Sequence, residues 1–220
     1  MANDEQRSTV NGRQSAISGR SSAVGGRKAV FLDRDGVINR MVYQPDFGLI
    51  DSPNNPDEFF LLPGVSRGVR QINEMGLLTI VISNQPGVAK GKFTEKLLKA
   101  TTDKMHRELA SEGARLDAVY YCLHHPEAMV PKYRSVCDCR KPKPGLLFQA
   151  AQEWGIDLRG SYFIGDGITD VLAGQAAGTQ TILISSRKPY LYEALSEHNA
   201  NPNYIVASLD EAVNLIREGM

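Results

Sequence analysis

The stretch Phe31-Leu32-Asp33-Arg34-Asp35-Gly36-Val37-Ile38-Asn39 decides how this chain is interpreted. Residues 28–32 are a short apolar run rich in β-formers, which predicts a strand that ends at Asp33. Asp35 follows two residues later, and Gly36 allows the backbone to turn sharply. Two carboxylates this close repel each other unless a cation lies between them, and Mg²⁺ with oxygen ligands meets that need. The alternative is a strand followed by an ordinary acidic turn, and motifs later in the chain must decide between the two.

The length and composition set broad limits on the protein. A chain of 220 residues has the length of one domain with a buried core. Lysine plus arginine equals aspartate plus glutamate, at 25 each, so the net charge favours neither nucleic acid nor a membrane surface as a partner. No apolar run approaches the roughly 20 residues of a membrane-spanning helix. All three cysteines lie between Cys122 and Cys139, which favours a metal site or reactive thiols in a reducing cytoplasm over a secreted disulfide framework.

Two segments lack the periodicity of packed elements. Residues 1–27 are mostly Ser, Gly, Arg, Asn and Gln, so we expect a disordered tail before a single domain that spans residues 28–220. Residues 40–60 hold three prolines, two adjacent asparagines and several acids, which predicts a long loop. Because it follows the Asp33 strand, this loop could cover or rim a site there, and a simple surface excursion is the alternative.

The rest of the chain alternates between strands and helices. Strands are expected at residues 28–32, 77–82, 116–121, 161–164, 180–184 and 204–206, and helices at 63–75, 94–112, 144–154, 171–177, 191–198 and 209–218. The buried stripe of the helix after Thr94 is expected to consist of Leu97, Leu98, Met105 and Leu109. This alternation predicts an α/β fold with a central parallel sheet and helices on both faces. Polar motifs follow several of the strands, at the edge where such sheets place their ligands.

Three of these motifs could join Asp33 at that edge. Ser83 offers a hydroxyl to a phosphate oxygen, although a turn hydrogen bond would also explain it. The run from Arg140 to Pro144 places cations just before a helix start, where the helix dipole repels them, so an anion explains them better than a solvated basic loop does. Asp166 lies between two glycines and Asp170 follows four residues on, which adds carboxylates after a second strand.

These motifs resemble motifs I to IV of the haloacid dehalogenase (HAD) superfamily of phosphohydrolases, in the right order and over about residues 28–185. The residues that carry the resemblance are Asp33-x-Asp35-Gly36, Ser83, Lys141 and Gly165-Asp166-x-x-x-Asp170. The resemblance implies a Rossmann-like HAD fold and an aspartyl-phosphate mechanism, with Asp33 as nucleophile and Asp35 as general acid and base. It also implies that Mg²⁺ is held by Asp33, by the backbone carbonyl of Asp35 and by Asp166. Ser83 and Lys141 would hold the phosphoryl oxygens, and Asp170 would orient its neighbours.

A second group of residues has the composition of a zinc site. Cys122-x-His124, then twelve residues, then Cys137-x-Cys139 supplies three thiolates and one imidazole, the ligand set of a closed structural site. His125 could replace His124, and three buried free thiols are the alternative to a metal. Zn²⁺ here would pin the loop of residues 122–140 and present Arg140 and Lys141 to the phosphate.

The zinc loop narrows the resemblance. The segment Cys122-Leu-His-His-Pro, followed by Val136-Cys-Asp-Cys-Arg-Lys-Pro-Lys-Pro-Gly145, resembles that of the D-glycero-D-manno-heptose 1,7-bisphosphate 7-phosphatases. This family acts on a sugar bisphosphate in the assembly of lipopolysaccharide or surface heptose, and it lacks a large cap domain. The related histidinol-phosphate phosphatases have a shorter loop. By analogy Arg140 would read the sugar or its remote phosphate, and Arg34, Asn84 and Gln85 would also contact the substrate.

Some residues depart from that family pattern. Motif II usually has Thr where this chain has Ser83, Pro86 replaces a Ser, and Gly167 stands where Lys is common. These changes leave the chemistry intact but leave the sugar and its anomer open. The hypotheses are therefore a Mg²⁺-dependent sugar-bisphosphate phosphatase, a phosphatase for another small molecule such as histidinol phosphate, and a zinc-stabilised binding module without catalysis. For the first we expect a cytoplasmic monomer with a small-molecule substrate and neither nucleic acid nor membrane as a partner.

Overall fold

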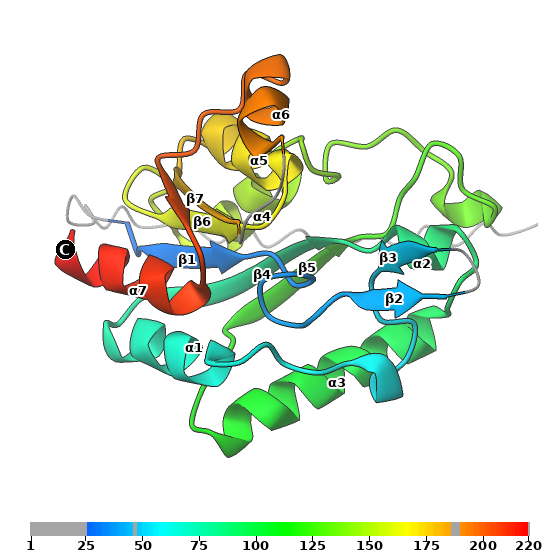
Figure 1. Ribbon diagram of the computed structural model, residues 1–220, viewed down its shortest axis with the longest axis horizontal. Coiled ribbons are helices and arrows are strands. Elements are labelled where there is room, and N and C mark those ends of the chain that lie inside the picture. The colour runs from blue at the N-terminus through cyan, green and yellow to red at the C-terminus, as the bar shows by residue number, and fades with distance from the viewer. Residues whose placement is uncertain (1–25, 46–47, 186–189, 220) are drawn as a thin grey trace, which may run out of the picture.

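A six-stranded parallel sheet forms the centre of the molecule (Figure 1). The computed structural model describes residues 26–45, 48–185 and 190–219. The strands run in the spatial order β5-β4-β1-β6-β7-β8. Their bounds are β1 Ala29–Leu32, β4 Leu78–Asn84, β5 Ala118–Cys122, β6 Tyr162–Gly165, β7 Gln180–Ile184 and β8 Tyr204–Val206. Every neighbouring pair is parallel, which confirms the predicted α/β class.

Helices cover both faces of this sheet, because alternate residues of its inner strands point to opposite sides. Val30 and Leu32 of β1 pack on one side, whereas Ala29 and Phe31 pack on the other. The first side is covered by α1 Val65–Glu74, α3 Glu95–Ser111 and α7 Leu209–Glu218, and the second by α4 Gly145–Trp154 and α5 Ile168–Ala177 (Figure 1). A short helix, α6 Leu191–Glu197, packs through Leu195 against Leu183 of β7.

The helix ends follow the local sequence signals. The side-chain oxygen of Thr94 accepts a hydrogen bond from the backbone N–H of Leu97 at the start of α3, and Ser208 does the same for Glu211 in α7. One prediction about α3 was wrong. Leu98, Met105 and Leu109 are buried, but Leu97 is 38% exposed. Residue 97 lies one position from Leu98, so it is turned about 100° away from the buried stripe.

The prediction of a loop over residues 40–60 was incomplete. This segment contains an antiparallel hairpin, β2 Val42–Gln44 and β3 Leu49–Asp51, and a single 3-10 turn, η1 Pro56–Glu58. A four-residue helix, α2 Pro86–Ala89, also follows β4, where no helix was expected. The hairpin and α2 both lie near the end of the molecule at which the sheet strands finish (Figure 1). The predicted tail of residues 1–27 falls almost wholly outside the described residues.

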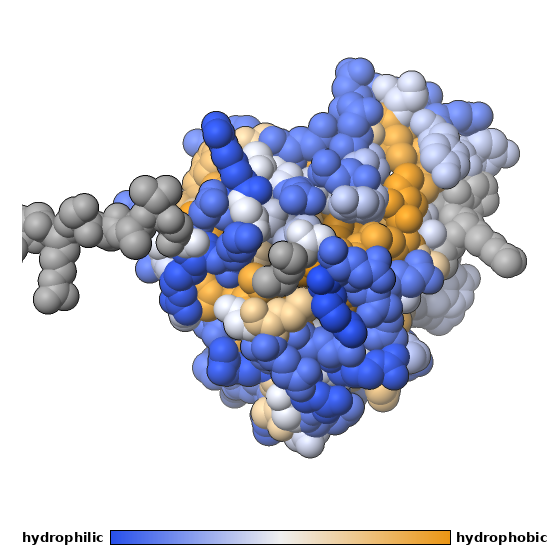
Figure 2. Space-filling view, turned by 90° about the vertical axis from the view of Figure 1, so that its left-hand side faces the viewer, coloured by the Kyte–Doolittle hydropathy of each residue, from blue (hydrophilic) through white to orange (hydrophobic). Residues whose placement is uncertain are grey.

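The two ends of the sheet differ in what they carry. Figure 2 looks at the end where the strands begin, and hydrophilic side chains predominate on that surface. The polar motifs after β1, β4 and β6 all lie at the other end. Within the described residues, none of the helices has the length and apolarity that a membrane span would need.

Candidate active site

Three acidic residues come together where β1 and β6 end. Asp33, Asp166 and Asp170 can each offer one carboxylate oxygen such that the three oxygens lie within 4.8 Å of one another. The neighbouring strands β1 and β6 pair in register from Val30 with Tyr162 to Leu32 with Ile164, so the residues that follow them meet at one edge. Gly36 makes this close approach possible. Its φ is +85°, and a Cβ there would lie 2.4 Å from Asp166 Oδ2.

Lys141 lies among these carboxylates and is 3% exposed. Its Nζ is 2.9 Å from Asp33 Oδ1 and 2.5 Å from Asp170 Oδ1, and it donates to the backbone oxygen of Ile82 at 3.0 Å. Burial disfavours a charged lysine, but the two carboxylates outweigh it and raise the pKa of Lys141. Burial also raises the pKa of Asp33 to about 6; Lys141 opposes this shift, and Asp170 and Asp35 add to it. The site therefore holds a permanent cation beside a carboxylate that ionises only above mildly acidic pH.

The backbone of Lys141 is fixed by Asn84 at the end of β4. The side-chain oxygen of Asn84 accepts from the backbone N–H of Lys141, and its side-chain nitrogen donates to the backbone oxygen of Lys141, both at 3.1 Å. Asn84, which we expected to contact the substrate, thus holds the backbone at Lys141 in place. Asp170 has a similar role in α5, because its Oδ2 accepts from the backbone N–H of Gly167 at 2.9 Å.

The Asp35 carboxylate lies in a separate network and is not part of the acidic group. Its Oδ1 accepts from Arg34 Nε at 3.2 Å, Arg34 Nη2 at 3.0 Å and Asn39 Nδ2 at 2.9 Å. Its Oδ2 accepts from Arg34 Nη2 at 3.1 Å, Gln85 Nε2 at 2.6 Å and Ser52 Oγ at 2.9 Å. Burial would raise the pKa of Asp35, but Arg34 and the amide hydrogen bonds outweigh it and lower that pKa.

Arg34 and Gln85, which we expected to contact the substrate, are both 0% exposed. Arg34 Nη2 also donates to Gln85 Oε1 at 2.9 Å, and Gln85 Nε2 is 3.2 Å from Ser83 Oγ. Both side chains are thus enclosed by the protein and hydrogen-bonded within the network of Asp35 and Ser83. Asn39 and Ser52 were not foreseen as members of this network. Asn39 closes the opening motif of the sequence, whereas nothing in the sequence distinguishes Ser52 from other loop serines.

The acidic group fits a magnesium ion. Octahedral Mg²⁺ needs hard oxygen ligands separated by about 3 to 4 Å, and the three carboxylates can meet that spacing. The missing side chain at Gly36 leaves room for Asp166 in this arrangement. The Asp35 carboxylate already has its own partners, so a ligand from this residue would be its backbone carbonyl, as the sequence resemblance implied.

The four expected zinc ligands form a second group. Cys122, His124, Cys137 and Cys139 can place their ligand atoms within 4.8 Å of one another. The Sγ of Cys139 is 3.2 Å from the Sγ atoms of both other cysteines and 3.3 Å from His124 Nδ1. Tetrahedral zinc–thiolate bonds place sulfur atoms about 3.8 Å apart, so small shifts would complete a site. Burial raises the pKa of the Cys122 and Cys139 thiols, so a metal would have to displace their protons.

His125 and Arg140 flank this cysteine and histidine group. His125 Nδ1 accepts from the backbone N–H of Glu127 at 3.1 Å, so this ring supports a turn and His124 is the imidazole in the group. Arg140 Nη1 donates to the backbone oxygen of His124 at 3.4 Å. The group is also tied to β4, since the backbone N–H of Gln85 donates to the oxygen of Cys122 at 2.8 Å.

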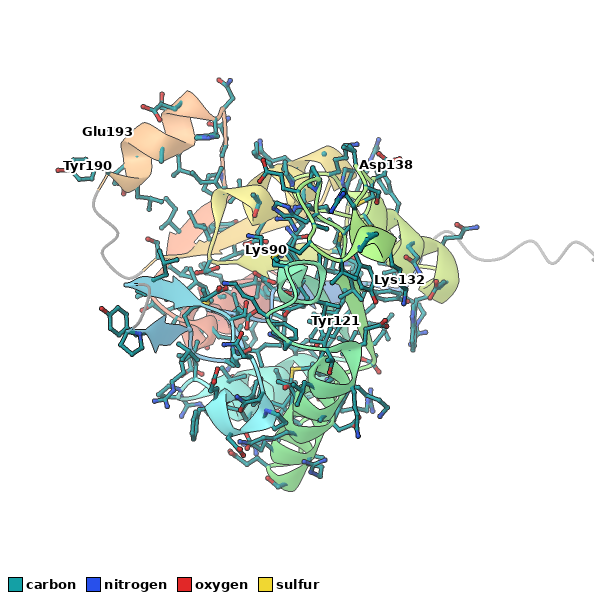
Figure 3. All side chains as sticks on the ribbon, turned by 90° about the vertical axis from the view of Figure 1, so that its right-hand side faces the viewer. Lys90, Tyr121, Lys132, Asp138, Tyr190 and Glu193 are labelled. Atoms are coloured by element: carbon teal, nitrogen blue, oxygen red, sulfur yellow. The ribbon has the colours of Figure 1, made fainter. Side chains whose placement is uncertain are left out.

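Figure 3 shows the end of the molecule that carries both groups. Tyr121 and Lys90 lie near the middle of the view, and Asp138 lies on the loop at the upper right. Glu193 is on α6, which stands apart at the upper left, and Tyr190 directly precedes that helix. The backbone N–H of Val130 donates to the oxygen of Ala89, so the loop of residues 122–140 is joined to the end of α2. The site is thus bordered by the hairpin, α2 and this loop.

The chain resembles known proteins in sequence. A family model described as HAD-hydrolase-like matches residues 138–212. The D-glycero-beta-D-manno-heptose-1,7-bisphosphate 7-phosphatase of Escherichia coli (strain K12) is 41% identical over 167 residues, 76% of this chain and 83% of that protein. The enzyme of the same name from Yersinia pestis is 37% identical over 190 residues, 86% of this chain and 95% of that protein.

Two solved structures share the fold. The D,D-heptose 1,7-bisphosphate phosphatase from B. bronchiseptica, complexed with magnesium and phosphate, aligns with a TM-score of 0.73 at 29% identity and covers 88% of this chain and 99% of that one. The corresponding enzyme from Burkholderia thailandensis aligns with a TM-score of 0.60 at 26% identity and covers 87% of this chain and 99% of that one.

Proposed function

Because this chain belongs to the family of the D-glycero-D-manno-heptose 1,7-bisphosphate 7-phosphatases within the HAD-like hydrolases, we propose that it removes the 7-phosphate of that sugar bisphosphate. The observation that supports this most is the meeting of Asp33, Asp166 and Asp170 at the carboxyl edge of the sheet, where Asp33 and Asp170 also pair with Lys141. A nucleophilic carboxylate, a metal-binding acid and a phosphate-binding lysine are the parts that phosphoryl transfer needs. The heptose phosphate that this reaction releases would be used in the synthesis of heptose for lipopolysaccharide or other surface glycans.

The first half of the reaction forms an aspartyl-phosphate. The Asp33 carboxylate attacks phosphorus, and the bond from phosphorus to the sugar O7 breaks with its electrons on oxygen. Asp35 gives a proton to that oxygen, so the sugar leaves as a neutral alcohol. Because the pKa of Asp35 is lowered in the free protein, this carboxylate must take up the proton when the negatively charged phosphate binds beside it. Lys141 and Ser83 would hold oxygens of the phosphoryl group during the transfer.

The second half returns the enzyme to its starting state. Asp35, now ionised, takes a proton from a water molecule as the water attacks phosphorus, and the bond between Asp33 and phosphorus breaks. Inorganic phosphate and the free Asp33 carboxylate result. Mg²⁺, held by Asp33, Asp166 and the backbone carbonyl of Asp35, would supply positive charge that offsets the repulsion between carboxylate and phosphate. Zn²⁺ on the cysteine and histidine group would hold the loop that carries Arg140 and Lys141.

Phosphate release from a substrate panel tests this proposal. The panel contains the α and β anomers of the heptose 1,7-bisphosphate and histidinol phosphate, assayed with Mg²⁺. We expect the heptose bisphosphates to have the highest kcat/KM, and Asp33→Asn to lose at least about 10³-fold of it. Asp103→Asn, on the exposed face of α3, is the matched control and should keep full activity. If histidinol phosphate were hydrolysed faster than the heptose bisphosphates, it would be assigned as the substrate instead. If Asp33→Asn were as active as wild type, the aspartyl-phosphate mechanism would be excluded.

A further inference from the structure

The Asp35 carboxylate has more hydrogen-bond donors than an exposed catalytic acid would have. Three donor contacts reach Oδ1 and three reach Oδ2, whereas an ionised carboxylate has about four lone-pair sites. The residue is 8% exposed. Its orientation is therefore set by neighbours, and those neighbours determine whether its proton can reach the leaving oxygen.

Arg34 contributes half of these contacts. Its guanidinium is fully buried, and its side-chain partners are Asp35, Gln85 and the ring of Tyr121, whose centroid lies 5.6 Å from its Cζ. A buried charge with one carboxylate partner is weak support for stability, because removing both ions from water costs several kcal/mol. The fork geometry of arginine does, however, fix the plane of a carboxylate, which a point charge cannot do.

Ser52 holds the same carboxylate from a separate segment of the chain. It follows β3 directly, and its hydroxyl donates to Asp35 Oδ2 at 2.9 Å from 17 residues further along the chain. The hairpin is in turn held by an ion pair between Asp51 and Lys92, which follows α2. The hydroxyl can also accept a hydrogen bond, so Ser52 can remain bonded to Oδ2 when Asp35 carries a proton.

We propose that Arg34 and Ser52 are positioning residues of the phosphatase reaction, which hold the Asp35 carboxylate between them and act on the substrate only through it. This inference rests on the proposed function, and it replaces substrate contact as the role of Arg34. Arg34 fixes the plane of the carboxylate from inside the fold. Ser52 joins Oδ2 of the carboxylate to the hairpin beside the site.

The leaving group distinguishes this role from a general effect on folding. Asp35 protonates a basic alkoxide when a sugar phosphate is cleaved, but the weakly basic p-nitrophenolate leaves without a proton. The value of kcat/KM reports the steps up to departure of the leaving group. We expect Arg34→Met to lose about 10²-fold in kcat/KM on the heptose bisphosphate and less than about threefold on p-nitrophenyl phosphate. Arg34→Lys, which keeps the charge without the fork, should lose nearly as much and show the same substrate dependence.

Ser52→Ala gives an independent test, because it removes one hydroxyl from a surface loop and leaves the core intact. We expect a loss of about three- to tenfold on the heptose bisphosphate and no change on p-nitrophenyl phosphate. The matched controls are Arg67→Met, on the exposed side of α1, and Ser111→Ala, at the end of α3. Both should behave like wild type with either substrate.

A double-mutant cycle checks that both residues act through Asp35. In an Asp35→Asn background, Arg34→Met and Ser52→Ala should cost nothing further on the heptose bisphosphate. Equal losses on both substrates, or full additivity with Asp35→Asn, would overturn the inference and leave a structural role. If wild type releases phosphate and Asp33→Asn does not, the proposed function stands even when these variants fail. If wild type hydrolyses no phosphate ester, the proposed function fails as well.

Discussion

Lys141 is the residue whose charge matters most to the folded site. It is buried between Asp33 and Asp170, so its removal leaves two carboxylates without their cation. Breaking a buried ion pair by removing one partner costs about 3–5 kcal/mol. We therefore expect Lys141→Met to lower the free energy of unfolding by about 3 kcal/mol without Mg²⁺, as measured by urea denaturation.

Magnesium should recover part of that loss, because it would bind Asp33, one of the two carboxylates that Lys141 neutralises. The control is Lys143→Met, whose solvent-exposed ion pair with Asp138 contributes little to stability. If Lys141→Met were as stable as wild type without Mg²⁺, the balance of charges described here would be wrong. A loss that Mg²⁺ leaves unchanged would mean that the cation binds away from Asp33.

The ionisation of Asp33 gives a dependence on pH. Burial raises its pKa to about 6 in the protein without Mg²⁺, so the carboxyl is mostly neutral below that pH and mostly charged above it. A proton on Asp33 competes with the metal, and Mg²⁺ affinity should fall up to about tenfold for each pH unit below 6. Calorimetric titrations at pH 5, 6 and 7 measure this slope. In Asp33→Asn, the Mg²⁺ affinity should lack the pH dependence that comes from Asp33. A wild-type affinity that did not change with pH would contradict the prediction.

At the residue scale, sequence motifs found the groups that strand ends bring together. Asp33 and Asp166 meet as the resemblance implied, because each follows a strand of the parallel sheet, and Lys141 contacts Asp33 from the loop before α4. The sequence motif could not show whether the Arg34 side chain contacts the substrate or the Asp35 carboxylate. Ser52 reaches Asp35 only through the path of the hairpin, and no local pattern encodes that contact.

At the scale of elements, the long regular segments were predictable and the short ones were not. β7 and α7 have the bounds that their periodicity indicated, Gln180–Ile184 and Leu209–Glu218. β2 and β3 have three residues each, too few to show alternation among the prolines around them. α2 has four residues, about one turn, and its formation depends on packing of Val88 and Ala89 under the loop of residues 122–140.

The loop of residues 122–140 should depend on bound zinc for its stability. Four ligand atoms within 4.8 Å of one another hold both of its ends, and few other core residues lie within it. A zinc-selective chelator should therefore increase hydrogen exchange over residues 122–140, because the metal supplies much of their folding free energy. Exchange in α7 should not change. Cys137→Ser should show the same pattern without chelator, and metal analysis that finds no zinc in untreated protein would refute the site.

At the scale of the whole molecule, the sheet order explains why distant segments share one site. β4, β1 and β6 are adjacent and parallel, so residues near positions 33, 83 and 166 end at the same edge, and Lys141 joins them through Asn84. The side chains of β1 pack against helices from both halves of the sequence, α1 and α7 among them. We propose on this basis that residues 28–220 form a single domain. Ligands that bind at the site should then raise the stability of the whole domain.

The stability change on binding of inorganic phosphate, the reaction product, tests this expectation. Phosphate alone meets the negative charges of Asp33, Asp166 and Asp170, so it should bind weakly and raise the melting temperature little. With Mg²⁺ present, phosphate at about 100 times its Kd should stabilise the fold by about 2.7 kcal/mol, a rise in Tm of roughly 5–10 °C. Calorimetry with Mg²⁺ alone, phosphate alone and both together measures the difference. If the shift with both ligands only equalled the sum of the separate shifts, the metal and the phosphate would not share the site that these carboxylates form.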